Sequence, residues 1–457
     1  MGDEFEKLLT AMKVSPARIL ILSYITVILS GSIILWIPIA SSNGKPMSYI
    51  DALFTATSAV CVTGLTIRDT GSDFSLFGQI VIILLIQIGG IGYLTLANLL
   101  NIFLVKHISL FDKLVMKESF QVFNIENINQ FIVRVIKFTL FFELIGCALF
   151  AIKFVPQLGF AKGMFYSLFH AISAFCNAGF SLFPRSFEDY KGSLFIVGTL
   201  SILIVCGGIG FIVWNDLYEV IIKHKKRNLN LHTKIVLSTT GTLIAIGFVL
   251  FFLFEISNPL TIKFLTWKEK ILVALFQSVT PRTAGFNTIA VGNMNNYTLL
   301  LIMILMFIGA SPGSTGGGIK TSTFTILLLT SKAYIQRRRE VNLFNRCISQ
   351  ETSIKAFTIF FIALSILSIS IISLLITEKG DLLKIAFEAF SAFGTVGLST
   401  GNSINNVSLC ATFSPLGKIV LVVLMCIGRI GVLLLATLIL PPKEEGAKYI
   451  EEPIAIG

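Results

Sequence analysis

The sequence has 457 residues, of which 54% are hydrophobic and only 13% are charged. A soluble domain usually carries about 25% charged residues, and no long hydrophilic stretch is present that could form a separate soluble domain. This composition excludes a soluble globular, disordered or coiled-coil protein and predicts an all-α polytopic membrane protein. The net charge is +11, but in a membrane protein the distribution of Lys and Arg matters more than their total.

Eight apolar segments are long enough to cross a bilayer, since a helix needs roughly 20 residues to span the hydrocarbon core. In chain order they are Ala17–Ile39, Leu76–Val105, Phe131–Phe154, Leu194–Ile222, Ile235–Ile256, Leu299–Thr330, Ala356–Ile376 and Leu416–Leu440. The first segment is longer than the hydrophobic region of a signal peptide, which has about 7–15 residues. We therefore expect it to be a transmembrane helix.

A shorter apolar segment lies inside each successive pair of spans. The four short segments are Tyr49–Val60, Met164–Phe175, Lys270–Thr280 and Lys384–Phe393. At 1.5 Å per residue they reach only about 15–18 Å, so they can enter the membrane but cannot cross it. The predicted repeating unit is therefore a span, a re-entrant half-helix, a loop and a second span.

Each half-helix leads into a motif that recurs along the chain. The four copies are TSAVCVTGL at 57–65, ISAFCNAGF at 172–180, SVTPRTAGF at 278–286 and FSAFGTVGL at 390–398. Their glycines (Gly64, Gly179, Gly285 and Gly397) are spaced by 115, 106 and 112 residues, close to a quarter of the chain. Such even spacing indicates a tandem repeat. We predict four pore units, 17–118, 119–229, 230–346 and 347–442, with tails at 1–16 and 443–457.

The positive residues predict the orientation of these units. With eight spans, both termini lie on one side, which carries 19 Lys and Arg residues against about 12 on the other. The more positive side is expected to be cytoplasmic. We therefore expect a protein of the plasma (inner) membrane with both termini in the cytoplasm. The re-entrant loops are expected to enter the membrane from outside. Two strongly basic loops, 223–234 and 332–355, either serve this topology alone or also dock a cytoplasmic partner or anionic lipid.

The motif predicts an ion-selective ring. Irregular backbone inside a bilayer must be buried in protein or line a water-filled path, and a ring of carbonyls can replace the hydration shell of a cation. The fourth motif contains TVG, the start of the TVGYG filter of potassium channels. Packing of small residues is the alternative for a single motif, but four matched copies favour a filter. The expected filter residues are Val62, Thr63, Gly64, Asn177, Ala178, Gly179, Thr283, Ala284, Gly285, Thr395, Val396 and Gly397.

These four units and motifs, which cover essentially the whole chain, resemble the ion-conducting subunit of the Trk/Ktr/HKT superfamily of potassium transporters. The resemblance is closest to the bacterial Ktr type (KtrB-like), because only about 16 residues precede the first span, whereas larger Trk relatives carry an additional helix pair. It implies a pseudo-fourfold pore around one central axis, a homodimer, and a cytoplasmic ring of nucleotide-binding (KtrA-like) regulatory subunits. ATP or ADP is expected only on that ring. No cofactor is expected in this chain, which transports potassium and contacts membrane lipid but no nucleic acid. A role for sodium, as activator or coupled ion, stays open.

A glycine-rich segment interrupts the second span of the third unit. It reads GASPGSTGGGIKT at 309–321 and is too rich in Gly, Pro and small residues for a continuous helix. It is not a nucleotide-binding loop of the form GxxxxGK[ST], because Ile319 separates Gly318 from Lys320 and no strand precedes it. A packing kink remains an alternative. The family resemblance implies an intramembrane gate, and the expected gate residues are Gly309, Ala310, Ser311, Pro312, Gly313, Ser314, Thr315, Gly316, Gly317, Gly318, Lys320 and Arg429.

Several charged residues lie inside predicted spans, where a charge is costly without a partner or water. Arg429, in IGRIG of the last span, either ties carbonyls of a neighbouring helix or faces the pore and pairs with the gate loop. We expect Arg282 to brace the filter from behind. Arg134, Lys137 and Glu143 fall in one span, either near its cytoplasmic end or at a subunit contact.

Three other functions are weighed against potassium conduction. A sodium-preferring relative often has Ser at the first filter glycine, whereas this chain has Gly64. An intramembrane enzyme would need paired Asp, a Ser/His pair or HExxH within spans, and the proximity of His170 to Cys176 has no supporting acid or oxyanion motif. A secondary transporter with broken helices would be expected to have inverted repeats, whereas these four units run in parallel order.

Overall fold

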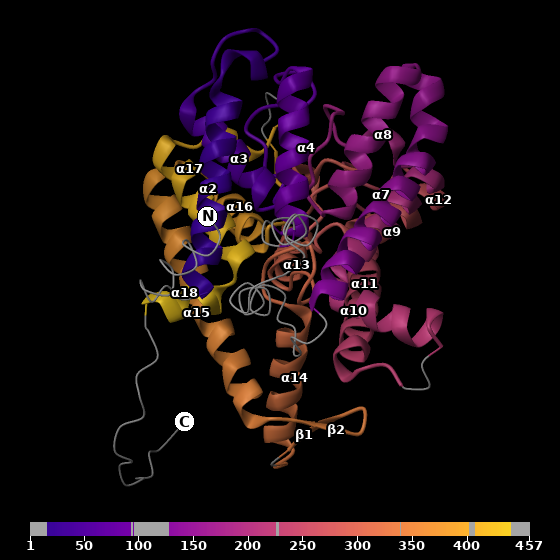
Figure 1. The fold of residues 1–457 in the computed structure, drawn as a ribbon, viewed down its shortest axis with the longest axis vertical. Helices are drawn as coiled ribbons and strands as arrows, with labels where there is room; N and C mark the ends of the chain where they lie inside the picture. Colours follow the sequence, from indigo (N-terminus) through magenta and orange to yellow (C-terminus); the bar gives the residue numbers. More distant parts are fainter. Residues whose placement is uncertain are drawn as a thin grey trace.

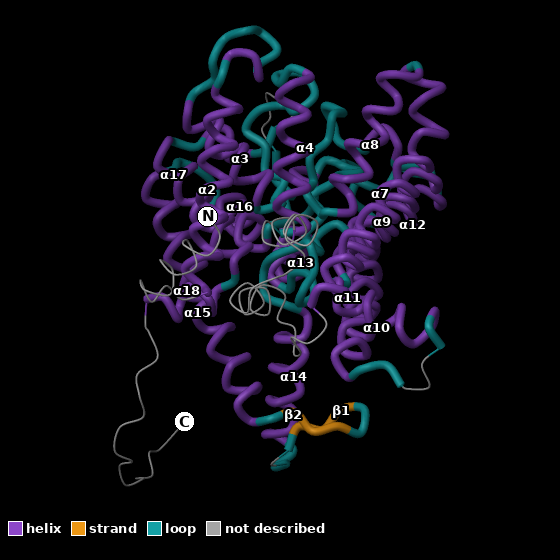
Figure 2. Tube along the Cα trace, viewed as in Figure 1, coloured by secondary structure: helices purple, strands orange, loops and turns teal. Residues whose placement is uncertain are grey.

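The computed structural model describes residues 16–92, 95, 128–224, 228–338, 340–401 and 407–439. These residues are mostly helical, and the long helices run roughly along the long axis of the molecule (Figures 1 and 2). The expected cytoplasmic tails, apart from Pro16, and the basic segment 106–117 lie outside the described residues. The same holds for 225–227 and for Arg339 in the two basic loops.

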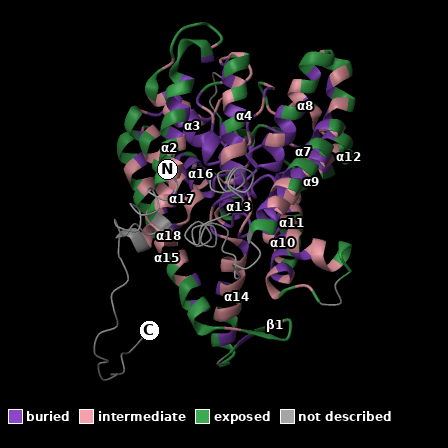
Figure 3. Cartoon of the chain, in the orientation of Figure 1, coloured by how far each residue is buried: buried purple, intermediate pink, exposed green. Residues whose placement is uncertain are grey.

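Four long apolar helices are sufficient in length and composition to cross a membrane, and they correspond to the four predicted first spans. They are α2 (Pro16–Trp36), α7 (Ile128–Leu158), α11 (Leu231–Glu255) and α15 (Gln350–Thr377). Between 17% and 33% of each apolar stretch is buried inside the protein. The rest of each stretch is not buried within the chain, and Figure 3 shows exposed residues on the outer helices.

Four shorter helices each bury a large part of their residues inside the molecule. They are α3 (Tyr49–Val60), α8 (Phe160–Phe175), α12 (Trp267–Val279) and α16 (Leu382–Gly394). The lengths of 12 to 16 residues correspond to about 18–24 Å, so these half-helices cannot cross a membrane. Thr266 and Glu269 form a capping box at the start of α12. The hydrogen bonds that Thr266 donates to this carboxylate lower the pKa of Glu269 below its ordinary value.

The second spans are broken in all four units, whereas the sequence analysis expected a break only in the third. Their first parts are α4 (Leu76–Ile91), α9 (Leu194–Gly208), α13 (Asn296–Phe307) and α17 (Pro415–Ile430). Three of them end near a glycine of left-handed φ, at Gly92 (+88°), Gly210 (+94°) and Gly431 (+101°). A right-handed helix cannot continue through that conformation. After α9 the chain turns by 94°.

The remaining elements follow these breaks or connect the units. The helical ones are η1 (Pro38–Ala40), η2 (Glu188–Tyr190), α10 (Phe211–Leu217), the π-helical η3 (Tyr218–Ile222), η4 (Val291–Asn293), α14 (Thr321–Ile335), η5 (Leu409–Thr412) and α18 (Val432–Ile439). Strands β1 (Val341–Leu343) and β2 (Arg346–Ile348) pair antiparallel, with Val341 opposite Ile348. This hairpin joins α14 to α15 at one end of the molecule (Figure 1). It was not predicted, and the expected unit boundary after residue 346 falls inside β2.

The helices pack in a cyclic order. Within each unit the first span contacts the half-helix, as α2 contacts α3 and α7 contacts α8. Between units the second-span helix contacts the half-helix of the next unit, and the last unit contacts the first. These pairs are α4 with α8, α9 with α12, α13 with α16, and α17 with α3. The carboxyl ends of the four half-helices, where the repeated motifs begin, therefore face a common centre.

Candidate functional site

The four motif segments adopt the same unusual backbone conformation. Two residues of each segment have positive φ, with one ordinary residue between them. The first positions are Val62 (+55°), Asn177 (+60°), Thr283 (+71°) and Thr395 (+49°), and the second are Gly64 (+90°), Gly179 (+71°), Gly285 (+76°) and Gly397 (+87°). A left-handed conformation costs about 1–2 kcal/mol for a residue with a side chain. Such backbone strain persists only where the surrounding structure holds it, and it clusters at functional sites.

The four segments meet one another in a closed ring. A Cβ atom built on each motif glycine would collide with, or closely approach, a carbonyl oxygen of another unit. These contacts join Gly64 to Ala178, Gly179 to Ala284, Gly285 to Val396, and Gly397 to Thr63. All twelve expected filter residues are buried except Gly179, which is partly exposed. The structure therefore brings together all the residues expected to form a filter, and glycine is required where two segments approach this closely.

A hydroxyl group at the end of each half-helix fixes the motif that follows. Two hydroxyls accept a hydrogen bond from the motif glycine, and two donate to the carbonyl after it. The bonds are Gly64 N to Ser58 Oγ (3.0 Å), Gly397 N to Ser391 Oγ (3.1 Å), Ser173 Oγ to Phe180 O (2.8 Å) and Thr280 Oγ1 to Phe286 O (2.7 Å). The sequence analysis did not single out these four residues. The signal was available, because Ser recurs at the same motif position in three units, while the third has Val279 there and uses Thr280 instead.

A second set of polar side chains, one helical turn earlier, holds the chain beyond the motif. His170 Nε2 lies 3.2 Å from the amide of Leu182, which donates to it. Gln277 Nε2 donates to Thr288 Oγ1 at 3.4 Å, and Ser399 Oγ donates to Glu388 Oε1 at 2.5 Å. All three half-helix side chains are buried. His170 is therefore a brace behind the ring, and its contacts provide no support for hydrolase chemistry.

The glycine-rich loop lies directly against Thr283 and Thr395, the first filter residues of the third and fourth units. It begins after α13 ends at Phe307, and Ile308 and Ile319 form a parallel bridge across its base. The amide of Gly317 donates to Thr395 Oγ1 at 2.8 Å. A Cβ on Gly316 would collide with Thr283 Oγ1. The loop is thus a separate layer that covers one side of the ring.

The loop is held mainly by backbone groups at the ends of the neighbouring broken helices. The bonds run from Ser311 N to Gly208 O (3.0 Å), from Phe211 N to Gly313 O (2.8 Å), and from Gly318 N to Gly428 O (3.3 Å). The last carbonyls of a helix have no partner within the helix. The breaks in α9 and α17 therefore supply acceptors that satisfy amides of the loop.

Arg429 links the loop to the first unit. Its guanidinium donates to the carbonyl oxygens of Thr315 and Gly89, and it lies 3.4 Å from that of Gly90. A cation at the carboxyl end of α4 is favourable because the helix dipole is negative there. In IGRIG, Arg429 occupies the position that Gly90 has in IGGIG and Gly208 in CGGIG. Both contacts considered from the sequence, to a neighbouring helix and to the loop, are made by this one side chain.

Several other charged residues of the spans have partners within the chain. Arg282 is buried and its Nη2 lies 3.4 Å from Thr240 Oγ1 of α11, behind the ring, where the sequence analysis expected a brace. Lys320 Nζ donates to Gly316 O at 2.7 Å. Arg134 pairs with Glu219 at 3.1 Å, so it stabilises the junction between α7 and η3. Lys137 is exposed, and Glu143 is buried near the ring.

At the opposite end of α3 from its motif, an ion-pair cluster joins the first and fourth units. Asp51, in the first turn of α3, accepts from Arg68 Nη2 and from Lys418 Nζ, each at 3.0 Å. Arg68 follows the first motif, whereas Lys418 lies in the first turns of α17. Because the cluster connects two units that are far apart in sequence, it helps to close the cyclic arrangement.

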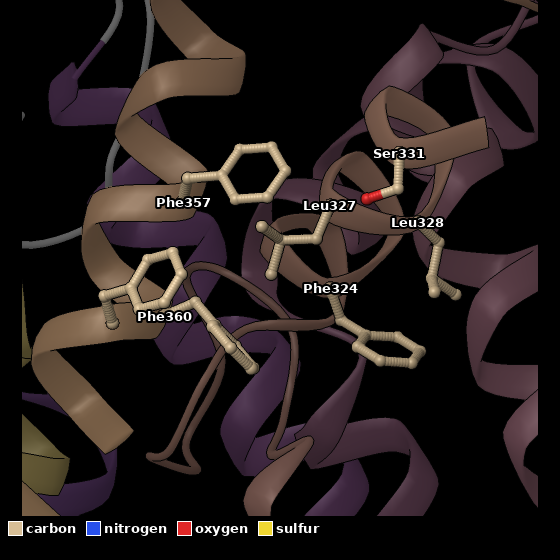
Figure 4. A pocket seen from close by; sticks show the side chains of 7 residues that line it. Phe324, Leu327, Leu328, Ser331, Phe357 and Phe360 are labelled. Atoms are coloured by element: carbon tan, nitrogen blue, oxygen red, sulfur yellow. The ribbon is translucent and has the colours of Figure 1, made fainter. Parts of the chain in front are cut away.

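An apolar pocket of about 230 Å³ lies away from the ring, between α14 and α15. Figure 4 shows side chains from both helices that line it, among them Phe357 and Phe360 of α15 and Ser331 of α14. None of the expected filter or gate residues lines this pocket. The candidate site is therefore the ring with its loop.

Comparison with known proteins agrees with this geometry. The family described as TrkH, cation transport protein, matches residues 10–446. The chain is 39% identical over 452 residues to the Ktr system potassium uptake protein B of Bacillus subtilis, with 99% of each chain covered. It is 38% identical over 452 residues to the potassium/sodium uptake protein NtpJ of Enterococcus hirae, which covers 97% of this chain and 98% of the relative.

A solved structure has the same fold. The crystal structure of the potassium transporter TrkH from Vibrio parahaemolyticus superimposes with a TM-score of 0.76 at 19% identity, covering 94% of this chain and 86% of that chain. At this identity the likeness concerns the fold alone. Together with the family match over most of the chain, it identifies a multi-pass membrane protein. The chain belongs to the TrkH family of cation transport proteins, and is a transporter and not an enzyme.

Proposed function

We propose that this chain is the ion-conducting membrane subunit of a potassium uptake system, in which the four motif segments form one central filter. The observation that carries the proposal is the ring: four segments with matched left-handed residues, each glycine against a carbonyl of another unit. The names of the relatives, a Ktr system potassium uptake protein and a potassium/sodium uptake protein, agree with it.

The filter acts by replacing water around the ion. A dehydrated potassium ion needs several oxygen ligands at once, and carbonyls from four segments can supply them around a common axis. The hydroxyl braces, such as Ser58 on Gly64 and Ser391 on Gly397, limit how far the ring can adjust to a smaller ion. Each half-helix also directs its negative carboxyl end toward the centre, which favours a cation.

The loop at 309–320 is the gate in this proposal. It lies against Thr283 and Thr395, so an ion leaving the ring on this side meets the loop. Arg429 keeps the loop across the path through its bond to Thr315, and its charge adds a barrier to a cation. Opening requires the loop to leave the bonds that it makes with the ends of α9 and α17.

The proposed assembly rests on the resemblance to the Ktr type. We propose a homodimer with both termini in the cytoplasm, controlled by a ring of nucleotide-binding subunits that carry ATP or ADP. The relative named as part of a Ktr system supports a partner subunit. The described parts of the basic loops, which include Lys223, Lys332 and Arg338, are the proposed docking surfaces.

A sodium-permeable transporter is the second candidate. The relative from Enterococcus hirae is named as a potassium/sodium uptake protein, and its identity to this chain nearly equals that of the Ktr protein. Gly64, the first of the four filter glycines, favours potassium, because a Ser there is often found in the sodium-preferring members.

Uptake of labelled rubidium into vesicles that contain the purified chain tests the proposal. We expect uptake that an excess of potassium abolishes and that an equal concentration of sodium leaves nearly unchanged. Vesicles without protein provide the background. Equal competition by both ions would favour the sodium-permeable candidate, and uptake no higher than the background, with or without the native regulatory subunit, would contradict ion conduction.

A further inference from the structure

Glu143 places a carboxyl group inside the protein at the midpoint of the apolar helix α7, where only 4% of the residue is exposed. An ionisable residue at such a depth is costly, and it usually pairs with another group or serves the transport path. Among the residues that the structure describes, no basic side chain forms an ion pair with Glu143. Charge pairing therefore does not explain its position.

The carboxyl group instead belongs to a cluster with Gln87 and Cys176. Gln87 Nε2, on α4, donates to Glu143 Oε2 at 3.1 Å. Cys176 Sγ lies 3.8 Å from Glu143 Oε1 and 3.8 Å from Gln87 Oε1. Three elements from two units thus converge on one point, and both oxygens of the carboxyl group have a partner.

Cys176 connects this cluster to the ring. It is fully buried and directly precedes Asn177, the first left-handed residue of the second motif segment. On another side, a Cβ on Gly90 would lie 2.6 Å from Cys176 Sγ, so α4 blocks movement of the thiol in that direction. The thiol is thus held at the residue that immediately precedes the left-handed Asn177, which has a φ of +60°.

The other units support their motifs differently. The residues that correspond to Cys176 are Cys61, Arg282 and Gly394. Arg282 donates a hydrogen bond to the hydroxyl of Thr240 on α11. A side chain at Gly394 would lie close to the carbonyl of Met306. Among the four first-span helices, only α7 carries an acidic residue near its middle, because Glu255 and Glu351 lie at helix ends.

We propose that Glu143 is a positioning residue for the second motif segment and determines how sharply the ring separates potassium from sodium, although it does not touch the ion. The inference rests on the proposed function, since it assumes that the ring selects the ion. A carbonyl ring discriminates through its size and the field of its oxygens. Loosening one of the four segments lets those oxygens adjust to the smaller sodium ion.

The test compares Glu143→Ala and Glu143→Gln with the control Leu144→Ala, which removes an exposed side chain at the next position of the same helix. Competition between rubidium and sodium is measured in vesicles, together with the maximal rate. Because Glu143→Ala leaves the buried amide of Gln87 without its acceptor, the variant should lower selectivity about tenfold and change the maximal rate less. Glu143→Gln should retain most of the selectivity, because its amide oxygen can still accept from Gln87.

Hydrogen exchange at the amides of Asn177, Ala178 and Gly179 gives a second readout that needs no transport. We expect faster exchange there in Glu143→Ala, with little change at Gly64, and no change in Leu144→Ala. If Glu143→Ala does not fold, Gln87→Leu removes the donor from the neighbouring unit and should produce the same two effects.

Two results would overturn the inference: parental selectivity together with parental exchange in Glu143→Ala, or equal defects in the Ala and Gln variants. Absence of rubidium uptake by the parent chain would count against the proposed function instead. In that case faster exchange at 177–179 in Glu143→Ala would support the positioning role alone, and unchanged exchange would contradict it.

Discussion

The ring and the loop are neighbours, but they are held in different ways. In the ring, the backbone bonds that join each motif to its half-helix are short: Thr63 to Ser58 at 2.8 Å, Ala178 to Ser173 at 2.7 Å, Ala284 to Thr280 at 3.0 Å and Val396 to Ser391 at 2.9 Å. Several backbone bonds of the loop are longer, such as those from Ala310 N to Gly317 O and from Gly318 N to Gly428 O, each at 3.3 Å, whereas the bond from Ser311 N to Gly208 O is 3.0 Å.

Side chains add to this difference. Each motif segment has a hydroxyl brace, and three of the four have a second polar side chain behind them. Five of the ten residues 309–318 are glycine. The loop is held by backbone bonds, by Arg429 and by a few side-chain bonds, such as Thr321 Oγ1 to Ser311 Oγ and Gly317 N to Thr395 Oγ1. A segment with few side-chain contacts belongs to the less stable part of a structure and opens first. The comparison teaches that selection and gating can be assigned to adjacent layers of unequal stability.

The largest expected effect comes from breaking the ring with Gly64→Ser. A side chain at Gly64 would collide with the carbonyl of Ala178, and the φ of +90° disfavours any residue with a Cβ. We expect the selectivity for rubidium over sodium to fall by more than about tenfold, equivalent to about 1.4 kcal/mol. Gly198→Ser is the matched control, because a Cβ at Gly198 on α9 has open space around it. Equal selectivity in the two variants would show that the ring is not the filter.

Deleting Gly316–Gly318 from the loop should have the next largest effect. The shortened segment cannot keep its contacts with Thr395 and Gly428. We expect basal rubidium flux to rise about tenfold, because about 1.4 kcal/mol shifts a two-state equilibrium by that factor. Flux through the purified variant is measured after gel filtration has established that it is folded. Unchanged or lower flux in a folded variant would make the loop a packing element.

Arg429→Ala and Arg429→Lys test whether the hydrogen bonds that Arg429 makes to the loop and to α4 set the barrier to ion flux. Arginine can donate to Thr315 and Gly89 together, whereas a single ammonium group is a point charge without this planar fork. We expect both variants to raise basal flux about threefold. Isotope flux at fixed driving force provides the measurement. If Lys kept the parental flux while Ala raised it, the charge and not the tie would set the barrier.

Ser58→Ala should have the smallest effect, mainly on stability. The variant leaves the buried amide of Gly64 without its acceptor, which costs about 1–3 kcal/mol. We expect a lower thermal midpoint in detergent and a modest loss of selectivity. Ser365→Ala, which removes a hydroxyl from the exposed face of α15, serves as the control and should leave the midpoint unchanged. Identical midpoints in the two variants would show that the brace contributes little.

The sequence predicts the parts of this fold that depend on local pattern. The first half-helix was expected at Tyr49–Val60 and has those bounds, and the predicted first spans lie within a few residues of α2, α7, α11 and α15. Length and hydrophobicity determine such segments, so they are visible without tertiary information. The repeat also identifies all twelve expected filter residues from the sequence alone. In the structure these residues lie together.

The structural features that the sequence did not predict depend on contacts between units. The breaks at Gly92, Gly210 and Gly431 are marked by repeated IGGIG, CGGIG and IGRIG patterns, but a glycine inside an apolar run is also compatible with helix packing. Two of the acceptors of Arg429, the carbonyl oxygens of Gly89 and Gly90, lie on α4, more than 300 residues away in sequence. The β1–β2 hairpin was not expected, since its strands have only three residues each.

A double variant tests most directly the claim that the ring selects and the loop gates. Gly64→Ser and the deletion of Gly316–Gly318 are combined, and rubidium flux and rubidium-over-sodium selectivity are measured on the same vesicles. Effects of independent elements add as free energies. The account predicts the low selectivity of the ring variant together with the high flux of the loop variant. A loop deletion that by itself abolishes selectivity while leaving flux unchanged would contradict the separation of the two roles.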